Sequence, residues 1–145
     1  MFKPVNRDQN CFLPPSLKSC VPVNDIIHTI IEIAEKLDTT KVESKYDVLG
    51  QNAYHPKMMI EILFYAYSQG VFSSREIEEN LKFDLRYMYL AGMHKPCFNR
   101  ICQFRRDHLE DIRELFVQIV RICQDKGLTP LKSVSIDGTK LGSSD

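Results

Sequence analysis

The chain has 145 residues, a length typical of one domain that can bury most of its apolar surface. Apolar residues make up 43% of it and charged residues 26%, a composition that is typical of a soluble globular protein and excludes disordered and fibrous classes. Lys and Arg, 19 in all, balance 19 Asp and Glu, so no overall basic charge indicates a nucleic-acid partner.

Residues 1–22 are predicted to form an extended arm on the surface, because four prolines in this stretch exclude a helix. The stretch also lacks the apolar core of a signal peptide. No window of the sequence reaches the roughly 18 uncharged apolar residues that a membrane span needs. We therefore expect a cytoplasmic protein that does not engage a membrane.

A first helix of about fourteen residues is predicted after Asn24, which is a good N-cap residue. Its buried face is indicated by apolar residues that recur every three or four positions. These are Ile27, Ile30, Ala34 and Leu37. The polar residues 39–50 that follow are predicted to form a loop with room for one helical turn.

The stretch from Pro56 to Gly70 is predicted to be the central helix of the core. Pro56 suits the first helical position, Gly70 suits a left-handed C-cap, and nearly every residue between them is apolar. A new helix should begin only three residues later, where Ser73 and Glu76 form a capping box. A short helix closed by Gly92 follows.

Two further helices are predicted before the periodicity changes. One is "FNRICQFRR" after Pro96, and the other is a long amphipathic helix from Leu109 to Gly127. After Pro130 the letters "SVSI" alternate as a strand does. We therefore expect an all-α domain at residues 23–128, preceded by the arm and followed by one strand in residues 129–145.

Charge is segregated in the second half of the chain. Residues 95–108 hold four cations and one anion, whereas residues 109–125 hold four anions and two cations. The neutral total conceals this local basic segment.

The helix within this basic segment has the side chains of a DNA-reading helix. If its aromatic and aliphatic residues face the core, Asn99, Gln103 and Arg106 share the outer side, flanked by Arg100 and Arg105. Asn, Gln and Arg are the residues that hydrogen-bond base edges in the major groove, and several short helices ahead of them suit a helix-turn-helix. A solvated polar face on a core helix is the alternative that these residues leave open.

A zinc site is a second alternative, because His94, Cys97, Cys102 and His108 offer four nitrogen or sulfur donors within fifteen residues. Their spacing is not a standard one, and we favour free cysteines that act as small apolar side chains. Five cysteines also cannot all pair, and a cytosolic chain keeps its thiols reduced, so we expect no structural disulfides.

Asp137 stands at the end of the predicted strand, before a glycine. A carboxylate on a strand is suited to hold a divalent metal ion, and two-metal phosphoryl chemistry needs several such groups together. An Asp-Gly pair is also the commonest hairpin signal, and that interpretation is favoured for these two residues alone.

Five segments of the chain, spread from Phe2 to Lys140, resemble the N-terminal part of bacterial insertion-sequence transposases of the DDE type, those with a helical InsH-like first domain. The segments are "FKPVNRDQNCFLPPSL", "YHPKMMIEILFYAYSQGVFSSREIEENL", "YLAG", "RICQFRRDHL" and "VSIDGTK". The resemblance implies a helical DNA-binding domain that recognises the terminal inverted repeats of the element. It also implies a following catalytic domain of RNase H-like fold, which the strand in residues 129–145 would begin.

The resemblance assigns a catalytic role to one residue of this chain. Asp137 of "DGT" would be the first acid of the catalytic triad and would hold Mg²⁺ together with a second Asp and a Glu. Such an enzyme lets water or a 3′-hydroxyl attack a phosphodiester between two magnesium ions. With one acid of the three, this chain is expected to bind no cofactor and to lack activity of its own.

The resemblance to a DNA-binding domain also indicates which residues should contact bases and which should contact phosphates. We expect base contacts from Arg100, Gln103 and Arg106, with Asn99 as a weaker candidate, and phosphate contacts from Lys95, Arg105 and Arg75. Many members of the family have a capping Asp where this chain has Cys97, so Asn99 or a shifted helix start would have to cap the helix instead. Another possibility is an inhibitory module that pairs with itself or with full-length transposase through the apolar face of the last helix.

Overall fold

The computed structural model describes residues 2–8, 16–47 and 54–127. In these ranges the chain forms eight helices and no strand, which confirms the predicted all-α class. The helices are α1 (Leu17–Cys20), α2 (Ile26–Glu35), α3 (Thr40–Asp47), α4 (Pro56–Ser68), α5 (Ser74–Phe83), α6 (Leu85–Leu90), α7 (Phe98–Asp107) and α8 (Leu109–Asp125). The predicted strand in residues 129–145 lies outside the described residues.

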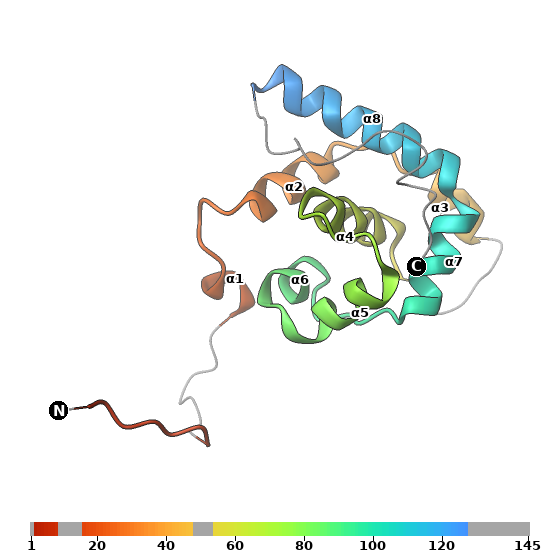
Figure 1. Cartoon of the computed structure of the whole chain (residues 1–145). Helices are drawn as coiled ribbons and strands as arrows, with labels where there is room; N and C mark the ends of the chain where they lie inside the picture. Colours follow the sequence, from red (N-terminus) through yellow and green to blue (C-terminus); the bar gives the residue numbers. More distant parts are fainter. Residues whose placement is uncertain (1, 9–15, 48–53, 128–145) are drawn as a thin grey trace.

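Helix α4 is the centre of the core, as its sequence predicts. It lies among the other helices in Figure 1, and an unbroken run of its residues from 62 to 68 is buried. It contacts α2 and α6. The Phe64 ring meets the Phe116 ring of α8 edge-on at a centroid distance of 5.2 Å, so α8 closes another side of α4.

The predicted helix boundaries around α4 and α5 are confirmed. Pro56 is at the start of α4, and Gly70 after its end has a φ of 78°, a left-handed conformation that a glycine adopts without strain. The Ser73 hydroxyl accepts the backbone N–H of Glu76 at 3.3 Å and caps α5. These two signals fix the sharp turn between the helices.

Three boundaries near the N-terminus differ from prediction. The arm contains the one-turn helix α1, because residues 16–21 hold no proline and Ser16 caps the turn. Helix α2 has ten residues and is capped by Asp25, not Asn24; the Asp25 carboxylate accepts the Ile27 N–H at 3.1 Å. The segment predicted as a loop holds α3, whose first N–H bonds to Asp38.

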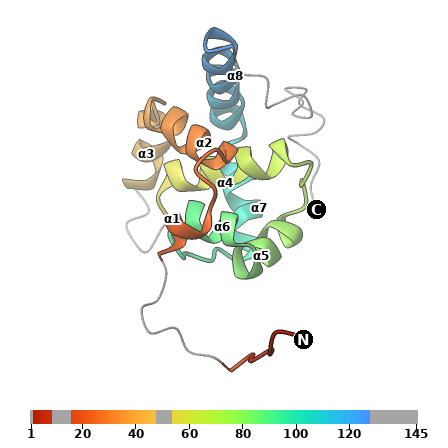
Figure 2. The same cartoon turned by 90° about the vertical axis from the view of Figure 1, so that its left-hand side faces the viewer.

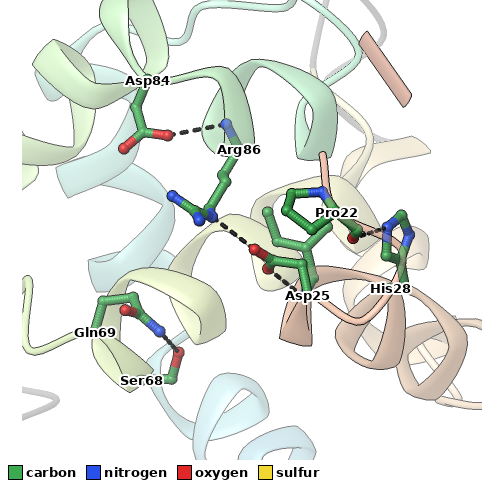
Figure 3. A network of polar contacts seen from close by, with 8 residues as sticks. Pro22, Asp25, His28, Ser68, Gln69, Asp84 and Arg86 are labelled. Carbon is green, nitrogen blue, oxygen red and sulfur yellow. Dashed lines mark hydrogen bonds and ion pairs between the residues drawn. The ribbon is translucent and has the colours of Figure 1, made fainter. Parts of the chain in front are cut away.

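A polar network joins the start of α2 to α6 (Figure 3). Arg86 Nε donates to the Asp25 carboxylate at 2.7 Å, and the Arg86 backbone N–H donates to Asp84 at 2.9 Å. His28 Nε2 donates to the Pro22 carbonyl at 3.0 Å. The chain before α2 is thereby tied to the α5–α6 corner.

The apolar face of α8 packs into the chain's own core. Its members Ile112, Phe116, Ile119 and Cys123 are buried. This burial contradicts the idea that the face serves dimerisation, because a partner could reach it only after the core had opened. None of the helices in the described ranges is long and apolar enough to cross a membrane.

Candidate nucleic-acid interface

Helix α7 packs against α5 and α8 through the face that the sequence predicts. Ile101 and Phe104 are buried, and Phe98 is half-buried. The predicted outer residues Asn99, Gln103 and Arg106 are exposed, as is Arg100. The structure therefore brings the four candidate base contacts onto the solvent side of one helix.

The cations of this outer face lack carboxylate partners. Within the described ranges, the side chains of Arg100 and Arg106 form no ion pair, and neither does that of Lys95, which is exposed just before α7. Elsewhere in the domain, six cations pair with acids: Lys41, Lys45, Lys82, Arg86, Arg113 and Lys126. Three cations without ion pairs in the described ranges therefore lie on or just before α7, although the whole chain is neutral.

Arg75 joins this surface from α5. Its guanidinium carbon lies 4.0 Å from the centroid of the Phe98 ring, a cation–π contact at the first residue of α7. Arg75 is otherwise exposed. The contact holds a positive charge next to the N-terminal end of α7.

Arg105 does not belong to this surface. It is only 6% exposed, and its Nη1 donates to the Phe72 carbonyl and to the Ser74 hydroxyl, both at 2.9 Å. The guanidinium also lies 5.5 Å from the Tyr67 ring centroid. This burial contradicts the predicted phosphate contact and gives Arg105 a structural role, in which it ties α7 to the start of α5.

The sequence contains the signal that places Arg105 inside. Arg105 follows Ile101 by four positions and Phe98 by seven, which is the spacing of the buried face. The positive charge of Arg105 indicates a surface position, whereas this spacing indicates the buried one that the structure shows.

The N-terminus of α7 has no side-chain cap. Cys97 is the N-cap residue, it is exposed, and its thiol accepts no hydrogen bond from the first turn. The expectation that Asn99 or a shifted start would cap the helix is wrong, since α7 begins at Phe98. The N–H groups of the first turn thus lack a side-chain acceptor at the positive end of the helix dipole.

The four possible zinc ligands do not form a common site. His94 and Cys97 are exposed, Cys102 is half-buried, and His108 is buried at the junction of α7 and α8. No group of three His, Cys, Asp or Glu side chains that could hold a metal ion occurs in the described ranges. Burial lowers the pKa of His108, and the nearby Lys45 lowers it further. The proposed metal ligand Asp137 lies outside the described residues.

Fold and surface together define an all-α domain that presents one exposed helix with unpaired cations. Residues 15–107 match the family described as "Transposase domain (DUF772)", and this match runs from just before α1 to the end of α7. It covers more than half of the chain, which therefore belongs to this family, and the family connects the chain to transposition. No curated protein and no solved structure matches the chain.

Proposed function

We propose that the chain is the DNA-binding N-terminal domain of a DDE-type transposase and recognises the terminal inverted repeats of its element through α7. One observation carries this proposal: in a transposase domain, Arg100, Gln103 and Arg106 stand on the solvent side of one helix, and neither arginine forms an ion pair with any residue that the structure describes. These side chains and Asn99 are of the types that read base edges in the major groove.

The proposed docking follows a helix-turn-helix pattern. Helix α7 has ten residues and is about 15 Å long, and a helix fits into the major groove, which is about 12 Å wide. Helix α5 packs behind α7 and would act as the supporting helix, with the short α6 between them in the chain. The outer side chains of α7 would then point toward the bases.

The proposed phosphate contacts lie at the N-terminal end of α7. Arg75 and Lys95 are exposed cations there, and the uncapped N–H groups of the first turn favour a bound anion. Phosphate contacts of this kind position a helix in the groove, and base contacts then give it specificity.

The test measures DNA binding by fluorescence anisotropy, with one duplex selected by the purified chain from a random pool and one random duplex. Gln103→Ala should cost about 1 to 3 kcal/mol on the selected duplex and little on the random one. Lys95→Ala should weaken both and reduce the slope of log affinity against log salt by about one. The matched control is Arg121→Ala, which removes an exposed α8 cation without an ion pair in the described ranges.

Two outcomes would contradict this proposal. Equal losses on both duplexes for Gln103→Ala would mean that α7 touches only the DNA backbone. If Arg121→Ala weakens binding as much as Arg106→Ala does, binding follows total charge and not the face of α7.

Asp137 is proposed as the first acid of the catalytic site on the resemblance alone. A single acid with water as the remaining ligands should hold Mg²⁺ weakly, so the chain should bind DNA without cutting it. Supercoiled DNA should stay intact with Mg²⁺ or Mn²⁺, and Asp137→Ala should bind DNA as the unaltered chain does. Nicking that disappears in Asp137→Ala would refute this part of the proposal.

A further inference from the structure

A groove of about 670 Å³ lies between the end of α1 and the corner where α5 meets α6. Val21 and Pro22 line it from one side, and Phe83 and Leu85 line it from the other. Phe83 is 74% exposed and Leu85 is 48% exposed, although both are large apolar side chains. Apolar surface of this kind gathered in a hollow marks a binding site more often than single exposed apolar residues do.

The polar network of Figure 3 fixes the two sides of the groove relative to each other. Arg86 on the α6 side bonds to Asp25 at 2.7 Å, and Pro22 on the α1 side accepts a hydrogen bond from His28. A groove held in this way needs little ordering when a ligand binds, which favours affinity.

The groove carries net negative charge. Glu79, Asp84 and Arg86 are the charged residues among those that line it. Because Arg86 is paired with Asp25, which is not one of the lining residues, Glu79 and Asp84 determine the charge that a ligand meets. The chemistry that fits is an apolar segment with positive side chains.

The outer part of the N-terminal arm, residues 2–8 and from here on called the arm, has that chemistry. Phe2 is 99% exposed, Val5 is 74% exposed, and the cations Lys3 and Arg7 are exposed beside them. Pro4 favours the polyproline II conformation, whose three-residue turn would place Phe2 and Val5 on one edge, about 9 Å apart.

The positions of the exposed apolar residues support binding of the arm in the groove. Six large apolar side chains are exposed in the described ranges, and only Met93 lies away from both the arm and the groove. Phe2 and Val5 belong to the arm, Phe83 and Leu85 line the groove, and Val23 directly follows the groove residue Pro22. In Figures 1 and 2 residues 2–8 lie away from the helices, so these residues and the groove both stay uncovered within one chain.

We propose that the groove binds residues 2–8 of the N-terminal arm of a second copy of this chain. When two chains exchange their arms, each arm fills the groove of the other chain and a two-fold dimer forms. No arm or groove is then left free to bind a third chain. No residue of α7 lines the groove, so this dimer and DNA binding by α7 can fail or succeed independently.

Cysteine cross-linking tests the proposal directly, because Cys20 is exposed and lines the groove. In a background with Cys11→Ser and Cys97→Ser, Val5→Cys treated with a short bismaleimide should give a covalent dimer on a denaturing gel, joined through residues 5 and 20. The dimer should disappear when Cys20→Ser is added. If residues 5 and 20 become linked only within single chains, each arm fills its own groove. If no link forms, the arm binds elsewhere. Either result overturns the proposal.

Sedimentation of the uncross-linked chain gives the second readout. Phe83→Asp should raise the dimer dissociation constant at least about tenfold, as expected for loss of a central apolar contact. Met93→Asp is the matched control, since it puts the same charge on the exposed apolar residue outside both surfaces. Arg7→Glu should also weaken the dimer, and Glu79→Arg in the same chain should restore it. A chain that stays monomeric at all concentrations, or an equal effect of Met93→Asp, would refute the proposed dimer.

Discussion

Two consecutive arginines of α7 should respond to substitution in opposite ways. Arg105→Met keeps an unbranched apolar stem in the core but removes the guanidinium that bonds Phe72 and Ser74. Arg106→Ala removes an exposed side chain that forms no ion pair within the described ranges. The first change should destabilise the domain, and the second should weaken DNA binding.

The magnitude for Arg105→Met follows from its two hydrogen bonds. A hydrogen bond to a charged group contributes about 1.5 to 3 kcal/mol, so two contribute about 3 to 6 kcal/mol before any compensation. Removing the buried charge also removes its desolvation cost, which returns part of this free energy. We expect a net loss of about 3 kcal/mol, which corresponds to about 10 °C in melting temperature for a domain of this size. Arg106→Ala should change stability by less than about 0.5 kcal/mol.

Circular dichroism melts and urea titrations measure the stability of each variant, and anisotropy at 15 °C measures its DNA affinity. The packing of α7 described above would be refuted if Arg105→Met melted within about 2 °C of the unaltered chain and lost DNA affinity as Arg106→Ala does. In that case Arg105 would face the DNA.

Two further predictions concern a half-buried acid and an exposed thiol. Burial raises the pKa of Glu61 from 4.5 to about 7, so the folded chain binds its proton more tightly than the unfolded chain does. Stability should therefore fall by up to about 3 kcal/mol as the pH rises from 4.5 to 7, and urea titrations of Glu61→Gln should show a smaller fall. Bound DNA should protect Cys97 at the start of α7 from maleimide but leave the exposed Cys20 reactive, as read by peptide mass spectrometry; equal protection of both would place the DNA elsewhere.

The features that the sequence predicts well depend on neighbours in the chain. The Ser73 cap of α5, the glycine after α4 and the apolar stripe of α8 are local signals, and the structure confirms them. The inner and outer faces of α7 were predictable for the same reason, because helical spacing alone separates Ile101 from Gln103.

The features that prediction missed depend on partners distant in the chain. Asp25 caps α2 in place of Asn24, and its carboxylate also holds Arg86 of α6, sixty-one positions away. Arg105 is buried because the Phe72 carbonyl, just before α5, and the Ser74 hydroxyl, at the start of α5, accept its hydrogen bonds. Charge type indicates a surface position for an arginine, and only the tertiary arrangement shows where its partners are.

The distribution of ion pairs bears on the proposed DNA binding by a chain of zero net charge. An acid that is already paired with a cation contributes little to the field at another surface, so the unpaired cations on and beside α7 would attract the proposed DNA. If Lys95, Arg100 and Arg106 and the stacked Arg75 each neutralise one phosphate, log affinity should fall with log salt with a slope of about −3 to −4. Anisotropy at five salt concentrations measures this slope. A slope near zero would remove this surface from the interface, and one steeper than about −6 would require cations beyond these four.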